Sequence, residues 1–316
     1  MVNPFYFITN MKHTHSSNSR NEPVSGVLYA ALAFLIWGLS PIYWKALGAV
    51  PALEIILHRI VWSFVFLVPL VIMQRCWKEL IDVLRNRRML LILMSTAVFV
   101  SCNWLLYIWA VNNDYLLQAS LGYYINPLVN VILGMVFLRE RLRTAQIMAV
   151  LLAAVGVLYL TVYYGVFPWI AITLALSFGF YGLIRKIAPV SSLVGLTVET
   201  MLLSFPALIY LVYIDTKGMG SMFRISLEMD LLLMGTSLIT AVPLLLFILG
   251  AKRILLSTVG LLQYIAPTGM FLLAVFVFDE SFSIAQVWTF VFIWIALAIY
   301  STDSICYYRR NYQAPS

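Results

Sequence analysis

Charged residues are scarce in this sequence. Asp, Glu, Lys and Arg make up 10% of its 316 residues, whereas 63% are apolar. A soluble domain carries about a quarter charged residues, so a protein of this composition would aggregate in water. The scarcity of charge excludes a soluble globular protein and favours one that is embedded in lipid.

Cysteines and catalytic motifs are also few. Cys76, Cys102 and Cys306 are widely spaced and odd in number, which predicts free thiols rather than a disulfide or metal framework. The chain contains no His-Glu-x-x-His, Gly-x-Ser-x-Gly or Gly-x-x-x-x-Gly-Lys motif. These absences argue against an enzyme and against an ATP-driven pump, and we expect no cofactor and no metal.

Long apolar runs are what the sequence does contain. They are too long for strands and lack their alternation, but they match the roughly 20 residues with which a helix crosses a bilayer. We predict an all-α membrane protein with ten transmembrane helices, at residues 27–46, 55–74, 89–111, 116–138, 145–163, 168–185, 194–214, 231–251, 255–278 and 284–306.

The net charge of +7 is spread over alternate loops. A nucleic-acid site would gather its cations in one patch, so none is expected. The positive-inside rule instead predicts a multi-pass protein of the cytoplasmic (inner) membrane with both termini in the cytoplasm. The cations that follow even-numbered spans include Arg85, Arg87, Arg88, Arg139, Arg141, Arg143, Arg185, Lys186, Lys252 and Arg253.

The two halves of the chain resemble each other at an offset of 140 to 141 residues, which pairs Pro127 with Pro267 and His58 with Glu199. Chance matches between apolar helices are the alternative. The offset predicts two five-helix repeats, 26–163 and 168–306, between a disordered cytoplasmic tail (1–25) and a second tail (307–316). Because five is odd, the repeats would be inverted, as in many secondary transporters. Other matched pairs are Tyr124 with Tyr264, Lys45 with Lys186, and Glu140 with Glu280.

The paired prolines predict helix breaks in equivalent places. Pro127 leaves the Tyr123 carbonyl without its helical partner, and Pro267 does the same to Gln263. A bare carbonyl costs several kcal/mol in lipid, so each break should face protein or a water-filled cavity. Paired breaks indicate a site near the membrane midplane, whereas a packing kink without a ligand is the alternative.

Among the ionisable residues within predicted spans or at their ends, where charge is costly, Lys45, His58, Arg59 and Glu199 stand out. Lys45 and Arg59 either face the site or extend to the interface. His58 and Glu199 reach water less easily, so either residue could bind protons and couple them to transport. A neutral, hydrogen-bonded packing role is the alternative for His58.

Amides and aromatics form a second group of candidates. Tyr123, Asn126 and Asn130 are spaced to share one helix face beside the carbonyl freed by Pro127. Such a face suits an organic solute with polar groups and an apolar body, although amides also link helices to each other. The remaining candidate substrate-binding residues are Asn103, Trp109, Gln263, Tyr264, Trp37 and Tyr181.

The segments Asn103–Asn113, Ala119–Asn130, His58–Ser63 and Gln263–Thr268 closely resemble the RarD branch of the EamA-type permeases, in the drug/metabolite transporter superfamily. The resemblance spans about residues 26–306 and is most specific over 103–140. It implies two inverted five-helix repeats around a substrate cavity, and the export of metabolites or drugs. The tail before Val24 is longer than the family pattern, which leaves Met1 or Met11 as the start.

These features together predict a secondary transporter, a permease for small organic solutes, driven by an ion gradient. A channel, or a flippase for lipids or amphiphiles, is the alternative with the same architecture. The expected partners are a small-molecule substrate and membrane lipid, and a homodimer is compatible with the sequence.

Overall fold

The computed structural model describes residues 22–113, 115–165, 167–277 and 283–312. Regular structure within these ranges is entirely helical. The predicted tail residues 1–21 and 313–316, with Glu280, lie outside them. The helices are α1 (Glu22–Ala46), α2 (Ala52–Met73), α3 (Trp77–Arg85), α4 (Arg87–Asn112), α5 (Leu116–Phe137), α6 (Thr144–Tyr164), α7 (Trp169–Ile187), α8 (Ser192–Thr216), α9 (Leu227–Ala251), α10 (Leu256–Leu262), α11 (Ile265–Phe276) and α12 (Ile284–Tyr312).

All ten predicted spans correspond to helical segments that are long and apolar enough to cross a membrane. Helix α1 begins at Glu22, inside the segment assigned to the first tail, and α12 continues to Tyr312, through most of the second. The ninth span is divided into α10 and α11. The short helix α3 was not predicted, because its sequence is too polar and brief to register as a span.

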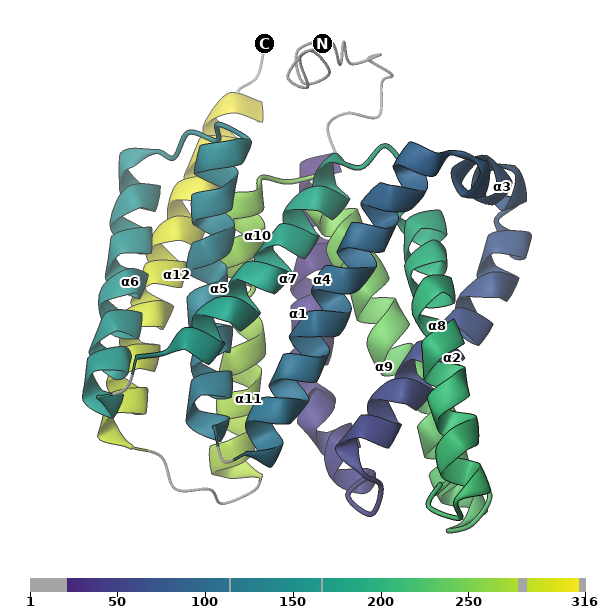
Figure 1. Ribbon diagram of the computed structural model, residues 1–316. Helices are drawn as coiled ribbons and strands as arrows, with labels where there is room; N and C mark the ends of the chain where they lie inside the picture. Colours follow the sequence, from purple (N-terminus) through teal and green to yellow (C-terminus); the bar gives the residue numbers. More distant parts are fainter. Residues whose placement is uncertain (1–21, 114, 166, 278–282, 313–316) are drawn as a thin grey trace.

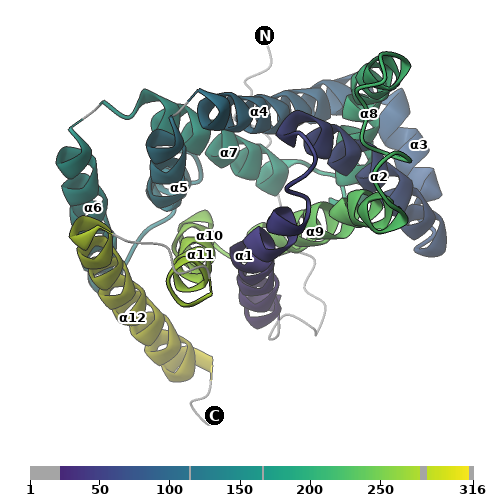
Figure 2. The same ribbon diagram turned by 90° about the horizontal axis from the view of Figure 1, so that it is seen from below.

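The first residues of α1 and the last residues of α12 lie on the same face of the bundle, at the top of Figure 1, together with α3. We call this the chain-end face and the opposite one the mouth face. Helices α6 and α12 pack together at one edge, and α2 and α8 pack together at the other (Figure 2). Helices α1, α4, α5, α7, α9 and α11 lie between these edges.

The helix bounds repeat along the chain. Helix α5 begins at Leu116 and α10 at Leu256, 140 residues later, and α6 and α12 begin at Thr144 and Ile284 with the same offset. Helix α1 ends at Ala46 and α7 at Ile187, an offset of 141 residues. Five crossings separate equivalent helices, so each helix runs opposite to its counterpart. These bounds are those expected of two inverted five-helix repeats.

Helices from different halves approach each other closely at the centre. A Cβ atom on Gly38 of α1 would lie 3.1 Å from the Ala266 carbonyl oxygen and 3.4 Å from the Gly269 Cα of α11. Only residues without a side chain allow backbones to come this near. The contact holds α1 against α11 and fixes one wall of the space described next.

Candidate functional site

A cavity of about 700 Å³ lies between the two halves. Its walls come from α1, α2, α4, α5, α7, α9 and α11, and from the residue Gln263 between α10 and α11. The lining begins at Phe34, near the middle of α1, and reaches Gly48 and Ala52 in the connection at the mouth face. The cavity therefore extends from the middle of the bundle to the mouth face.

An aromatic cluster closes the cavity toward the chain-end face. The rings of Phe34 and Trp37 from α1 pack against Phe247 of α9, each with centroids 6.0 Å from the Phe247 centroid. Phe178 of α7 lies 5.3 Å from Phe247 and 6.0 Å from Trp37, and Tyr181 stacks on Phe247 at 6.4 Å. Three helices from both halves thus meet between the cavity and the chain-end face.

The lining is aromatic and carries positive charge. Seven aromatic residues line it: Phe34, Trp37, Trp44, Trp104, Tyr107, Tyr123 and Phe178. Among the described residues that line the cavity, Lys45 and Arg59 are basic, and none is Asp or Glu. This composition provides apolar faces for the body of a solute and cations for a charged group.

Arg59 is held in place by three contacts. Its Nε donates a hydrogen bond of 2.9 Å to Thr240 Oγ1 of α9, and Thr240 Oγ1 in turn donates to the Thr236 carbonyl. The guanidinium carbon lies 4.8 Å from the ring centroid of Trp44 and 5.0 Å from that of Trp104. The Trp44 ring is itself fixed by a hydrogen bond from Nε1 to Ser40 Oγ, at 3.0 Å.

The asparagines that were predicted to bind substrate have two different roles: some line the cavity and others link helices. Asn126 lines the cavity, is 7% exposed, and its Oδ1 atom has no hydrogen-bond partner. Asn103 also lines the cavity, but its Nδ2 donates to the Leu174 carbonyl and Ser177 Oγ of α7. Asn130 is fully buried and donates to Gln263 Oε1 at 2.7 Å, so it links α5 to the α10–α11 junction.

The two prolines behave differently. The ninth span is interrupted, as predicted, at Gln263 and Tyr264, and Pro267 lies in the first turn of α11. Helix α5 is continuous across Pro127, so the prediction of a matching break there is wrong. A proline removes only its own N–H bond, and the turns on either side of Pro127 keep theirs. Pro267 lines the cavity, whereas Pro127 is buried behind it.

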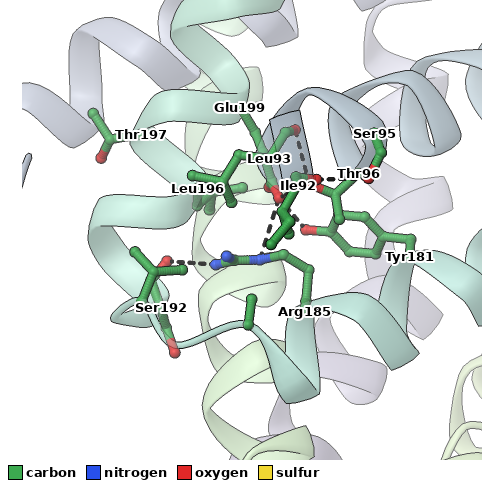
Figure 3. Close-up of polar contacts among 12 residues, drawn as sticks. Ile92, Leu93, Ser95, Thr96, Tyr181, Arg185, Ser192, Leu196, Thr197 and Glu199 are labelled. Carbon is green, nitrogen blue, oxygen red and sulfur yellow. Dashed lines mark hydrogen bonds and ion pairs between the residues drawn. The ribbon is translucent and has the colours of Figure 1, made fainter. Parts of the chain in front are cut away.

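Between the aromatic cluster and the chain-end face, Glu199 of α8 forms a buried ion pair. Its Oε1 atom lies 3.2 Å from Arg185 Nε and accepts a hydrogen bond of 2.6 Å from Thr96 Oγ1. Tyr181 Oη donates to the other carboxylate oxygen at 3.3 Å, and Arg185 Nη2 donates to the Ser192 carbonyl (Figure 3). Arg185 was predicted to be a loop cation. It is instead fully buried within α7, because Glu199 compensates its charge.

Two lysines connect the loops of the second repeat at the chain-end face. Lys186 Nζ, at the end of α7, donates to the carbonyls of Ala251 and Ile254 around the α9–α10 connection. Lys252 Nζ donates to the carbonyls of Ala188 and Val190 in the α7–α8 connection. We call this reciprocal pair the lysine latch. It joins the end of α7 to the end of α9 at the chain-end face, where Lys186 directly follows Arg185 of the buried ion pair.

His58 lies outside the cavity lining. It is 5% exposed, and its Nε2 atom lies 3.7 Å from Glu54 Oε1 without a hydrogen bond. The Glu54 carboxylate accepts from Ser221 N at 2.7 Å and from Ser221 Oγ at 2.8 Å. Asp230 of α9 accepts from Phe223 N at 2.7 Å. The two carboxylates thus hold the loop between α8 and α9 over His58.

The predicted site residues separate into two groups. Trp109, Asn130, Tyr264, Tyr181, His58, Glu199 and Pro127 do not line the cavity, although Tyr181 contributes to its closure. Trp109 is 44% exposed and stacks on Tyr115. The residues brought together around the cavity are Tyr123, Asn126, Asn103, Gln263, Trp37, Lys45, Arg59 and Pro267.

Several residues that shape the site were missed. Trp44 and Thr240 position Arg59, and Phe178 and Phe247 close the cavity. Nothing local in the sequence distinguishes these residues from ordinary membrane-helix residues. The offset of 141 offers one signal, because it pairs Trp44 with Arg185, a cation at the end of a predicted span.

Comparison with known proteins provides the family. Residues 24–162 match the EamA-like transporter family. The chain is 48% identical to an "Uncharacterized transporter" of Vibrio cholerae over 286 residues, covering 90% of this chain and 95% of that protein. It is 47% identical to "Protein RarD" of Escherichia coli, covering 90% and 97% of the two chains. A solved structure titled "Crystal structure of protein" aligns with a TM-score of 0.68 at 20% identity, covering 87% of this chain and 96% of that one, which shows a shared fold.

Proposed function

The chain belongs to the RarD branch of the EamA-like transporter family, and we propose that it is a secondary transporter that exports small organic solutes across the cytoplasmic membrane on an ion gradient. It is a multi-pass membrane protein. The observation that carries the proposal is the cavity between the two halves, which reaches the mouth face while an aromatic cluster separates it from the chain-end face.

Equivalent helices of the two halves pack differently at the two ends of the cavity. This difference supports a transport cycle in which the open end and the closed end exchange. Helix α7 packs against α9 at the closed end, whereas the equivalent helices α1 and α4 face each other across the cavity. At an offset of 141, the closing residues Tyr181, Arg185 and Glu199 correspond to Ser40, Trp44 and His58 on the mouth side. An inverted repeat can adopt the same closure at either end, which is the basis of alternating access.

The charge distribution supports an orientation. The connections at the chain-end face carry Arg85, Arg139, Arg141, Lys252 and Arg253. The positive-inside rule assigns such a face to the cytoplasm. On this assignment the cavity opens to the outside, and a solute bound from the cytoplasm requires the lysine latch and the aromatic cluster to separate. Export is the direction that the family resemblance suggests.

An ion gradient is the proposed energy source because the sequence has no phosphate-binding loop motif. His58 is the better candidate for proton coupling, since Glu199 is held by Arg185 whereas His58 Nε2 has no hydrogen bond. Glu54 on the same helix and Asp230 on α9 are the acidic groups that interact electrostatically with the His58 ring. His58→Gln should abolish uptake driven by a pH gradient but leave counterflow intact. Undiminished driven uptake would exclude His58.

The test of transport is counterflow in proteoliposomes loaded with a panel of organic solutes. A transporter accumulates labelled solute transiently against unlabelled solute and saturates, whereas a channel does neither. Scrambling of fluorescent lipid without solute counterflow would instead indicate a flippase. Empty liposomes and protein denatured before reconstitution serve as controls.

A further inference from the structure

We propose that the cavity selects organic anions with a flat apolar body, and that Arg59 binds their carboxylate. This inference rests on the proposed function, because it names the substrate class of the same site. Its basis is the state of the Arg59 side chain and the composition of the walls around it.

Arg59 carries a charge that no carboxylate of the described chain neutralises. The four described ion pairs involve His58, Arg143, Arg185 and Arg224, and none involves Arg59. An arginine in a membrane span is normally paired or faces a functional cavity. The contrast with Arg185 is direct, because that second arginine of the bundle interior lies 3.2 Å from Glu199. A ligand that brings a negative charge would complete the Arg59 site.

The guanidinium, which lines the cavity, keeps donors available for such a ligand. A guanidinium has five N–H donors, and Thr240 uses the one on Nε. Among the described residues, the four Nη hydrogens have no hydrogen-bond partner. The indole rings of Trp44 and Trp104 contact the guanidinium by cation–π interaction but do not neutralise its charge. The free edge of the fork suits a carboxylate, which two parallel N–H groups can bind.

The rest of the cavity determines which apolar group the ligand can carry. Seven aromatic side chains line the cavity. Among them, Tyr107 and Tyr123 form an edge-to-face pair with ring centroids 6.1 Å apart, and both line the same cavity as Arg59. Flat apolar groups stack favourably on such surfaces. Asn126 provides the second polar point, because its buried Oδ1 has no partner. A cationic solute would find no Asp or Glu among the described lining residues.

Two matched series of probes test the charge requirement. The first contains phenylacetate, phenylacetamide and phenethylamine, and the second contains indoleacetate, indoleacetamide and tryptamine. Each series keeps one aromatic body while the charge changes from negative to neutral to positive. Binding is measured as the concentration-dependent rise in melting temperature of the purified full-length protein in detergent micelles.

The expected result is that the carboxylates stabilise the protein and the amides and amines do not. Arg59→Gln should weaken carboxylate binding by about 10- to 100-fold, as for the loss of a charge-assisted hydrogen bond. Thr240→Val keeps the charge but frees the guanidinium, so it should weaken binding less. Arg224→Gln is the matched control, because its exposed ion pair with Asp215 lies outside the cavity.

The inference would be overturned by equal or better binding of the amides or amines, by unchanged carboxylate binding in Arg59→Gln, or by no stabilisation of the wild type by either carboxylate. Stabilisation by chloride or phosphate alone would also overturn it, since the site would then bind inorganic anions only. If Arg59→Gln does not fold, the inference is tested by the binding of the two probe series to the wild type and by carboxylate binding to Thr240→Val.

The outcomes separate this inference from the proposed function. Arg59-dependent carboxylate binding without counterflow in proteoliposomes would remove the transport proposal and leave the anion site. Saturable counterflow of neutral or cationic solutes, unaffected by Arg59→Gln, would keep the transporter and remove the anion site.

Discussion

The hydroxyl group of Tyr264 donates a hydrogen bond of 3.1 Å to the backbone carbonyl of Tyr124, and these two tyrosines are 140 residues apart. That separation is the offset between the two repeats, so the bond joins equivalent positions. Equivalent residues can meet only close to the axis that relates the halves. The α10–α11 junction and the middle of α5 therefore form the centre of the molecule.

Replacing Tyr264 by phenylalanine should lower the free energy of unfolding by about 0.5–1.5 kcal/mol, because the buried ring is kept and one hydrogen bond is lost. The measurement is the thermal unfolding of the purified protein in micelles. Tyr213→Phe is the control, since Tyr213 is 52% exposed on α8. Equal shifts in the two variants would mean that the bond contributes nothing.

Glu199→Gln should be far more costly. It leaves the fully buried Arg185 without a counter-charge, and breaking a buried pair costs about 3–5 kcal/mol. The double variant Arg185→Met with Glu199→Gln should recover much of the loss, as measured by melting temperature. Asp215→Asn, in the exposed pair with Arg224, should cost no more than about 1 kcal/mol. A double variant as unstable as the sum of the single variants would contradict the account.

Gly260→Ala should separate α10 from α5. A Cβ atom at Gly260 would lie 2.5 Å from the Pro127 carbonyl oxygen and 3.0 Å from Asn130 Cβ, so the backbones must move apart. Overpacking of this kind costs about 1–3 kcal/mol. Gly220→Ala, whose nearest neighbour would be 3.4 Å away, is the matched control. Indistinguishable melting curves for the two variants would show that the helices can separate freely.

Lys186→Met should loosen the chain-end closure, because it removes the bonds to the Ala251 and Ile254 carbonyls. The reporter is a single cysteine at Met270, which lines the cavity, in a background without Cys76, Cys102 and Cys306. Its labelling by a membrane-impermeant thiol reagent applied to the chain-end face should become several-fold faster. Lys217→Met, at the end of α8 on the mouth face, should leave the rate unchanged. Unchanged labelling in Lys186→Met would exclude the latch from the closure.

Much of the fold was predictable from the sequence, because apolar length specifies a membrane helix and the repeat offset aligns two halves. The ten spans follow from apolar length, and the interruption near Pro267 follows from the proline. The continuity of α5 across Pro127 was not predictable, since whether a proline divides a helix depends on what packs around it. Here Gly260 lets α10 pack directly on the Pro127 carbonyl.

The site was predictable only in part. Tyr123, Asn126 and Gln263 line the cavity, because polar residues within spans turn away from lipid. The same rule cannot separate a ligand-binding amide from a structural one, and Asn130 proved to link helices. Arg185 and Arg59 show the same limit. One is neutralised by Glu199 from the next helix and the other faces the cavity, and both arrangements arise from tertiary packing.

We propose that closure alternates between the two ends of one cavity. Distances between spin labels, measured by double electron–electron resonance in lipid, test it most directly. One pair, at Pro189 and Leu255, spans the closed end, and a second pair, at Gly48 and Asn113, spans the mouth. Alternating closure should give two populations for each pair, in which a solute that lengthens the Pro189–Leu255 distance shortens the Gly48–Asn113 distance. A single unchanging distance in both pairs, or lengthening of both together as in a channel, would contradict it.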